Sequence, residues 1–333
     1  MKFSLWRDRS RRRVRAAKPL RRLAIAALAV TAPALAADDS VAPLRAQDER
    51  LLRISEPILA RNSALCDRTM PDLGVALQSA DQYSDKARPP FAAPVAFAAV
   101  LPGSAAAQAG IRRDDGLLTV DGKAIVKRPD RLAAPLRDSA FDLLAGHAAG
   151  TPLVLGVVQA GQQRQMTIAV SQECLALVEV LAGNKVSAHS DGRVIQIGFG
   201  LAVRASDEQV ATIFAHELAH SVLHHRDRLS AADVNKGLLG EFGRSRRLNL
   251  QAEQEADRLS VHLLDNAGFD PRIAAEFWRS RLGRQLSGGM FHDRMHLSAR
   301  DRAVMLDNEI AKMAGRVPSY PAELIALRNQ PMR

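Results

Sequence analysis

The chain has 333 residues, with 46 Lys and Arg against 36 Asp and Glu, which gives a formal net charge of +10. Ten of the basic residues and one of the acidic residues lie within residues 1–36, so the rest of the chain carries 36 basic and 35 acidic residues. This balance excludes a nucleic-acid-binding function based on overall basicity. The same balance also removes the electrostatic argument for binding to an anionic membrane, although association with a membrane surface stays open as an alternative.

Residues 1–36 have the pattern of a secretory signal peptide. A basic segment reaches Arg22, an apolar run starts at Leu23, and Ala34-Leu35-Ala36 matches an A-x-A cleavage site. We therefore predict cleavage near Ala36, export to the periplasm, and ~297 remaining residues, which suffice for two domains. An uncleaved membrane anchor is the alternative, although the apolar run is shorter than the ~20 residues that span a membrane.

Residues 37–65 are expected to form an N-terminal helix. Between residues 47 and 65, apolar side chains recur at near-helical spacing, which is typical of a helix that packs against a core.

A small β-rich domain is predicted over residues 66–174, between the two cysteines of the chain. Residues 100–125 have the order strand, turn, short helix ending at Gly110, strand and turn. Two closing strands are expected over 151–158 and 165–170. In an exported chain Cys66 and Cys174 could form a disulfide that joins the ends of this domain, and two buried free thiols are the alternative.

This order of elements resembles the PDZ domains of exported bacterial proteases, although Asp114 stands where glycine is usual. The resemblance implies that an extended peptide adds as a strand beside a short glycine loop, with its C-terminal carboxylate held by loop N–H groups. The peptide-binding residues that match this stretch are Leu73, Gly74, Val75 and Ala76. A closed groove is the alternative, in which Gly74 is only a turn residue.

The run FAHELAH contains the most specific motif of the chain, HExxH. His216 and His220 are at positions i and i+4, so on a helix they share a face and can bind one zinc ion, while Glu217 acts as general base. An apolar strand is predicted over 194–203, followed by an S-x-x-Q capping box that starts a helix near Asp207. This context favours a metallopeptidase over two ordinary helix histidines.

A catalytic zinc needs a third protein ligand, and a helix predicted over 248–266, stopping at Gly268, offers one. Glu253 could ligate the metal, while Asp257 accepts a hydrogen bond from a ligand histidine and fixes its tautomer. Glu255 is the weaker ligand candidate. The remaining histidines near the motif are interpreted as structural or surface residues, namely His224, His225 and His292.

HELAH followed 33 residues later by EQEAD resembles the HtpX-type and CaaX prenyl protease-like family of zinc metallopeptidases, in its soluble, exported branch. The resemblance implies that His216, His220 and Glu253 bind zinc, that Glu217 is the catalytic base, and that Asp257 supports a ligand. The later run MHLSARDR is similar to the HPxxxxR segment of that family, with Leu297 in place of proline. This similarity places His296 and Arg302 at the marked positions of the segment. Our hypothesis is that His296, on a loop, steadies the oxyanion or caps the open metal position.

We therefore expect an α+β protein in which a PDZ-like domain precedes a mostly helical, gluzincin-type metallopeptidase domain with a short sheet, over residues 175–333. The predicted cofactor is one zinc ion per chain. The predicted function is cleavage of unfolded or misassembled envelope polypeptides, with peptide C-termini bound at the PDZ-like domain. The alternative is a peptide-binding chaperone or adaptor whose zinc site is latent or structural.

Overall fold

The computed structural model describes residues 41–84, 87–128, 134–234, 243–287, 297–313 and 318–332. Helices and strands are mixed along these residues and most strand pairs are antiparallel, so the predicted α+β class is confirmed. The predicted signal peptide with Ala36 lies outside the described residues, and so do His292 and His296.

The helix expected over residues 37–65 is α1 (Ala42–Arg61), which is followed by the 3-10 turn η1 (Ser63–Leu65). Its inward face carries the apolar residues of the predicted pattern, and Ile54, Ile58 and Leu59 are at most 3% exposed. Contacts of α1 with strands of both larger sheets make it a packing helix, as predicted.

A six-stranded antiparallel sheet builds the β-rich part of the chain, in the order β2-β3-β4-β6-β7 with β5 paired to β4. Its strands are β2 (Val75–Ser79), β3 (Val95–Val100), β4 (Gly116–Val120), β5 (Lys123–Ala124), β6 (Leu153–Gln159) and β7 (Gln162–Ile168). A short helix, α2 (Ala105–Gln108), follows β3, and α3 (Pro135–Ala145) packs on β2, β3 and β4. The predicted order of elements is confirmed, although the last strand starts at Gln162.

Several turns in this sheet have a residue in the left-handed backbone conformation, at positions where the sequence predicts turns. Gly110 ends α2 with a φ of +86°, and Asp114 has a φ of +71°. Glycine is favoured in this region because a Cβ is strained there, so Asp114 departs from the PDZ pattern at a real conformational cost. Its carboxylate pairs with the buried guanidinium of Arg45 on α1, and this contact holds the turn in place.

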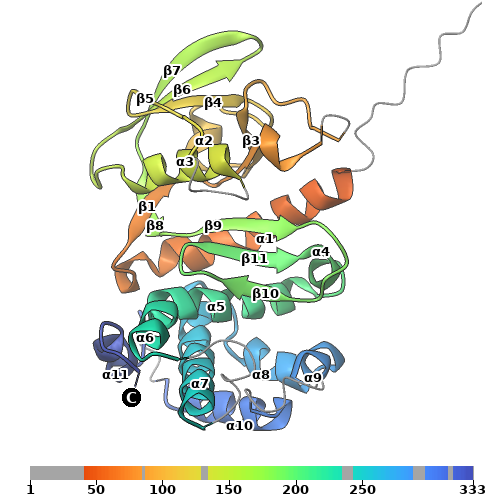
Figure 1. Cartoon of the computed structure of the whole chain (residues 1–333), viewed down its shortest axis with the longest axis vertical. Helices are drawn as coiled ribbons and strands as arrows, with labels where there is room; N and C mark the ends of the chain where they lie inside the picture. Colours follow the sequence, from red (N-terminus) through yellow and green to blue (C-terminus); the bar gives the residue numbers. More distant parts are fainter. Residues whose placement is uncertain are drawn as a thin grey trace, which may run out of the picture. The chain divides into compact units, whose positions relative to one another are not determined.

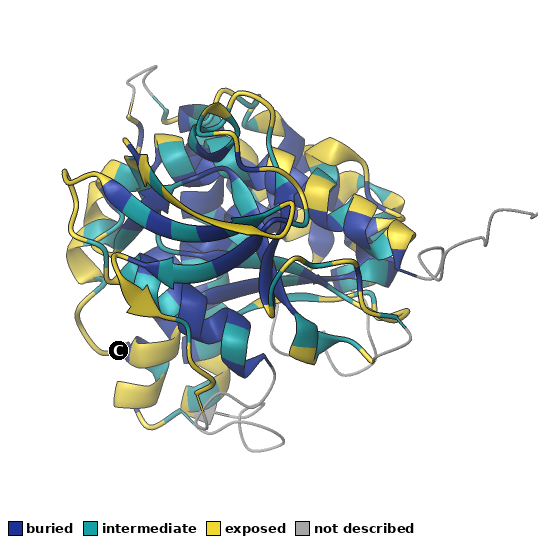
Figure 2. Cartoon of the chain, turned by 90° about the horizontal axis from the view of Figure 1, so that it is seen from above, coloured by how far each residue is buried: buried dark blue, intermediate teal, exposed yellow. Residues whose placement is uncertain are grey.

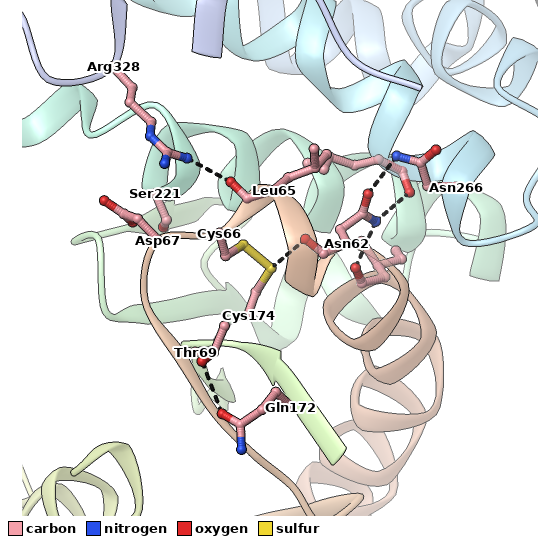
Figure 3. The surroundings of a disulfide bond; sticks show 12 residues. Asn62, Leu65, Cys66, Asp67, Thr69, Gln172, Cys174, Ser221, Asn266 and Arg328 are labelled. Atoms are coloured by element: carbon pink, nitrogen blue, oxygen red, sulfur yellow. Dashed lines mark hydrogen bonds between the residues drawn. A yellow bond between two sulfur atoms is a disulfide. The ribbon is translucent and has the colours of Figure 1, made fainter. Parts of the chain in front are cut away.

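Cys66 and Cys174 lie next to each other where the β-rich part joins the rest of the chain. β1 (Thr69–Asp72) pairs with β8 (Ser171–Cys174). Cys66 and Cys174 form a disulfide with their Cα atoms 5.5 Å apart, so the predicted bond is confirmed and the free-thiol alternative is wrong. Figure 3 shows this bond beside the segment that leaves α1, where Arg328 donates a hydrogen bond to the backbone oxygen of Leu65 at 2.7 Å.

A three-stranded sheet follows, built from β9 (Leu177–Leu181), β10 (Ala188–Ser190) and β11 (Val194–Gly198) in the order β10-β11-β9. The strand predicted over 194–203 is too long, because α4 (Phe199–Ala202) starts directly after β11. An added Cβ at Gly198 or Gly200 would lie 2.4 Å from a backbone oxygen of residues 184–185. The two glycines therefore let this neighbouring segment pack on the backbone, where the strand ends.

The remaining described elements are helices, namely α5 (Asp207–Val222), α6 (His225–Ala231), α7 (Gly243–Asn266), α8 (Arg272–Arg279), α9 (Arg281–Ser287), α10 (Ala299–Ile310) and α11 (Ala322–Leu327). α1 and α5 both pack against the three-stranded sheet and against each other, and α7 packs along α5 (Figure 1). Gly268, with a φ of +85°, follows α7 as predicted, whereas α7 begins before the predicted residue 248. Within the described ranges, no helix combines the length and apolar character needed to cross a membrane.

Buried side chains form two main apolar cores. One contains α1, the three-stranded sheet and the helices, and the other contains the six-stranded sheet with α2 and α3. Figure 2 shows buried residues along the strands and on inner helix faces, with exposed residues in loops and on outer faces. The predicted domain boundary at residues 174/175 falls between β8 and β9, yet Leu177 and Val194 pack in the second core, so the two cores are in contact.

Asp48 on α1 connects the two sheets. The carboxylate is 4% exposed and accepts hydrogen bonds from the backbone N–H of Val180 on β9 at 2.8 Å and from Nε2 of Gln78 on β2 at 2.7 Å. Burial raises the pKa of Asp48 to about 7, because the ionised form loses hydration that these bonds replace only in part.

Removing the disulfide should destabilise the fold. The bond joins residues 108 apart in sequence, and closing a loop of this length restricts the unfolded chain by about 3 to 5 kcal/mol. The double variant C66A/C174A is expected to lose free energy of unfolding in this range, measured by denaturant titration. A reductant should lower the stability of the wild type and leave that of the double variant unchanged. Equal stability of the oxidised wild type and the double variant would contradict the prediction.

Asp48 should make stability fall as pH rises. Its pKa is about 7 in the folded chain against the ordinary 3.8, so between these pH values the native state binds more protons and the free energy of unfolding decreases with pH. Relative to the wild type, Asp48→Asn should gain about 2 to 3 kcal/mol between pH 5 and pH 8 in denaturant titrations. The exposed Asp227→Asn serves as control, and a pH-independent difference for Asp48→Asn would refute the assignment.

Candidate metal centre

The helix that carries the HExxH motif begins at the predicted capping box. Ser206 Oγ accepts a hydrogen bond from the backbone N–H of Gln209 at 3.2 Å, and Gln209 Oε1 accepts one from the N–H of Ser206 at 3.1 Å. Phe214 and Leu218 of α5 are at most 1% exposed and fix the helix in the core. This packing leaves the motif histidines on the side of α5 that faces α7.

His216, His220 and Glu253 come together as predicted, and among the described residues they form the one group able to hold a metal ion. The Nε2 atoms of the two histidines are 3.1 Å apart. Glu253 carboxylate oxygens lie 3.4 Å from Nε2 of His216 and 3.5 Å from Nε2 of His220. The two Glu253 distances involve different oxygens, Oε2 and Oε1. One ligand atom from each residue lies within 4.8 Å of the other two, so the group could hold one metal ion, and these spacings are close to the ~3.3 Å between the ligands of a tetrahedral zinc.

The three donor side chains are mostly buried. The side chains of His216, His220 and Glu253 are 14%, 19% and 21% exposed. Burial lowers the pKa of His220 to about 3, and a neutral imidazole is the form that binds a metal. Three protein donors would leave the fourth position of a tetrahedral zinc ion for water or a substrate oxygen, which a catalytic site requires and a closed structural site lacks.

Asp257 and Arg302 form the support of His216 that the sequence indicates. Nδ1 of His216 makes no well-aligned hydrogen bond, but Oδ1 of Asp257 lies 3.0 Å from it, within reach after a small rotation of the ring. Arg302 on α10 donates to both oxygens of Asp257, from Nε at 2.6 Å and from Nη2. Its guanidinium stacks 3.5 Å above the ring of Trp278.

The charge of Asp257 is stabilised inside the protein. Burial alone would raise the pKa of this carboxyl, but Arg302 and His216 hold it below its usual value. Asp257 is therefore an ionised acceptor that faces the far nitrogen of a candidate ligand, as in metal sites where a carboxylate orients the histidine.

A second support, for His220, was not predicted. His225, interpreted from the sequence as structural or surface, is 1% exposed and places Nδ1 2.9 Å from Nδ1 of His220. Its Nε2 lies 3.1 Å from Oε2 of Glu255, the weaker of the candidate ligands. Burial lowers the pKa of His225, whereas hydrogen bonds from His225 and Arg228 outweigh burial and lower the pKa of Glu255 to about 2.

Glu217 lies beside this group on α5. Burial raises its pKa to about 7, which is close to the value that suits a general base at neutral pH, and a hydrogen bond from the backbone of Ser190 opposes the shift. Ser190 belongs to β10, and its hydroxyl lies 2.7 Å from the hydroxyl of Ser221 on α5. The edge strand of the three-stranded sheet is thus fixed next to the candidate base.

Two predicted features are left, His296 and the peptide-binding residues. His296 is outside the described residues, whereas Leu73 and Gly74 directly precede β2 and Val75 and Ala76 are its first two residues. Leu73 and Ala76 are 2% and 8% exposed. Gly74 has a φ of +63°, and a Cβ there would lie 2.4 Å from that of Ser104, so this position requires glycine.

Comparison of the chain with protein-family models and with curated proteins finds no match. The resemblance to the HtpX-type family therefore stays a prediction from the sequence motifs.

Zinc binding by the three donors is directly testable. The purified chain should bind one zinc ion, and Glu253→Gln should weaken binding by more than about 100-fold, because the neutral amide replaces an anionic ligand. Competition with a chromophoric chelator measures both values. Glu276→Gln, on the exposed face of α8, is the matched control. Equal affinity of the two variants would exclude Glu253 as a ligand.

Proposed function

We propose that the chain is an exported zinc-dependent endopeptidase that cleaves extended segments of unfolded or misassembled polypeptides. The observation that supports this most is the group of His216, His220 and Glu253, in which the two Nε2 atoms are 3.1 Å apart and each lies within 3.5 Å of a Glu253 oxygen. A carboxylate from the same turn of α5, Glu217, stands beside them. A structural zinc site would need a fourth protein ligand and would have no use for this base.

In the proposed reaction, a bound metal ion and the side chains of the protein would have different roles. A bound zinc ion would supply Lewis acidity toward a peptide carbonyl and would lower the pKa of a water molecule. Glu217, with a pKa of about 7, can take a proton from that water and pass it to the leaving amine. His296, outside the described residues, keeps its proposed role at the oxyanion or at the open metal position.

An extended substrate has a strand edge to bind. β10 (Ala188–Ser190) is at the end of its sheet and pairs with β11 on one side, and its residues are intermediate to exposed. An unpaired strand edge accepts another strand through main-chain hydrogen bonds, which depend little on side chains. A substrate aligned on β10 would pass close to Glu217, and this geometry favours unfolded polypeptides over folded proteins.

The six-stranded sheet supports a second, peptide-binding role for the same chain. β2 is an edge strand, and the backbone oxygens of Leu73 and Gly74 accept hydrogen bonds from the N–H groups of Ala106 at 3.2 Å and Leu101 at 2.9 Å. In a trans peptide the next N–H points the opposite way. The N–H groups of Gly74 and Val75 therefore point away from residues 101–106, where they could hold the C-terminal carboxylate of a peptide, as in a PDZ domain.

The disulfide supports the proposed location. Bonds such as Cys66–Cys174 form and persist in oxidising compartments, among them the bacterial periplasm. Together with the signal-peptide pattern of residues 1–36, this supports export to the periplasm and a role in protein quality control of the cell envelope.

Glu217→Gln separates the enzyme from a binding protein. The variant should keep its zinc and lose about 100- to 10,000-fold of the cleavage rate toward an unfolded test protein, because the amide cannot accept a proton. Glu208→Gln, at an exposed position of the first turn of α5, is the matched control and should cleave like the wild type. A chelator should abolish cleavage by the wild type.

The adaptor alternative gives the opposite result. If binding of peptide termini is the function, Gly74→Val should abolish activity, since the left-handed backbone and Ser104 leave no room for a side chain, whereas Glu217→Gln should not. Zinc-loaded wild type that never cleaves, under conditions where it binds C-terminal peptides, would refute the endopeptidase proposal.

A further inference from the structure

His225 lies in contact with one of the candidate zinc ligands, on a different helix. α5 ends at Val222, and His224, with a φ of +51°, turns the chain into α6, of which His225 is the first residue. The His224 side chain is held by Asp67, with Nε2 3.0 Å from Oδ2. This left-handed turn reverses the direction of the chain, so that the His225 ring packs against His220 with ring centres 4.9 Å apart.

Glu255, at the end of this series of hydrogen bonds, determines which ring nitrogens of His225 and His220 carry a proton. Glu255 forms an ion pair with Arg228 over 2.7 Å, so its carboxylate is an acceptor, and Nε2 of His225, 3.1 Å away, carries the proton between them. His225 is 1% exposed and Arg228 already balances the charge of Glu255, so the imidazole is neutral and its Nδ1 accepts the proton of Nδ1 of His220 over 2.9 Å. His220 therefore adopts one tautomer, which has a proton on Nδ1 and a lone pair on Nε2. This lone pair is directed at the metal position.

Glu255 is itself held by three donors. Oε2 also accepts from Nη1 of Arg228 at 2.7 Å, and Oε1 accepts from Nε2 of Gln251 at 2.7 Å. Arg228 is 4% exposed and donates from Nε to the backbone oxygen of Gln330 at 3.0 Å. The carboxylate cannot turn away from His225 without leaving a buried guanidinium unpaired, which is strongly unfavourable.

We propose that His225 is a positioning residue for the zinc ligand His220, acting as a hydrogen-bond relay between this ligand and the Glu255–Arg228 ion pair. The inference rests on the metal centre of the proposed function and extends it. Each ligand histidine then has its own support: Asp257 with Arg302 faces His216, while Glu255 with Arg228 reaches His220 only through a second imidazole. Without His225, the proton of His220 is free to occupy Nε2, where it blocks metal binding.

Two substitutions at His225 separate this role from simple packing. His225→Leu fills the same volume without nitrogen atoms and should weaken zinc binding by about 10- to 100-fold. His225→Gln can accept with Oε1 and donate with Nε2, so it should stay within about 3-fold of the wild type. His147→Leu removes another histidine paired to a carboxylate, that of Asp121 at 2.7 Å in the six-stranded sheet, and should not change zinc affinity.

Nitrogen chemical shifts of the imidazole rings in the full-length, metal-free chain give a readout that packing alone would not move. His220 should carry its proton on Nδ1 in the wild type and in His225→Gln, and on Nε2 for a large fraction of molecules in His225→Leu. Wild-type His220 protonated on Nε2 would overturn the relay even if His225→Leu fails to fold. Unchanged zinc affinity of His225→Leu would also overturn it, whereas a wild type that binds no zinc refutes the metal centre itself.

Discussion

The contact between α5 and α7 is the constraint on which the site depends. A single helix can direct two histidines to one side, but a third donor must come from another element at a distance set by side-chain packing. Buried residues of α5 and α7, among them Phe214, Leu218 and Leu259, fix this distance in one core. As a result Glu253 faces both imidazoles, with one carboxylate oxygen near Nε2 of each histidine.

Near the contact between α5 and α7, the buried carboxylates occur in ion pairs. Asp257 and Glu255 are both buried on α7, and each is bound to an arginine from another helix, Arg302 of α10 or Arg228 of α6. A buried carboxylate without such a partner would take up a proton and would stop orienting a histidine. The arginines thus allow the carboxylates to stay ionised next to a site that would hold a divalent cation.

The parts that could be predicted from the sequence are those that depend on neighbours along the chain. The capping box at Ser206, the helix end before Gly268 and the spacing of the HExxH motif are local, and the structure has each of them. The ends of elements were harder to predict: β11 ends at Gly198, where the backbone of residues 184–185 packs too closely for a side chain, and these residues are distant in sequence. His225 could not be recognised, since its role depends on a left-handed turn at His224 and on Glu255, 30 residues away.

The disulfide would hide cleavage of a peptide bond between Cys66 and Cys174. Cys66 and Cys174 enclose the whole six-stranded sheet, so a single cut in any loop between them leaves two pieces that are still covalently joined. Such a nicked molecule would migrate as intact chain in a gel without reductant and would separate into fragments only after reduction. Self-cleavage within this part of the molecule would therefore be hidden in an oxidising compartment, and the nicked protein could keep both of its cores together.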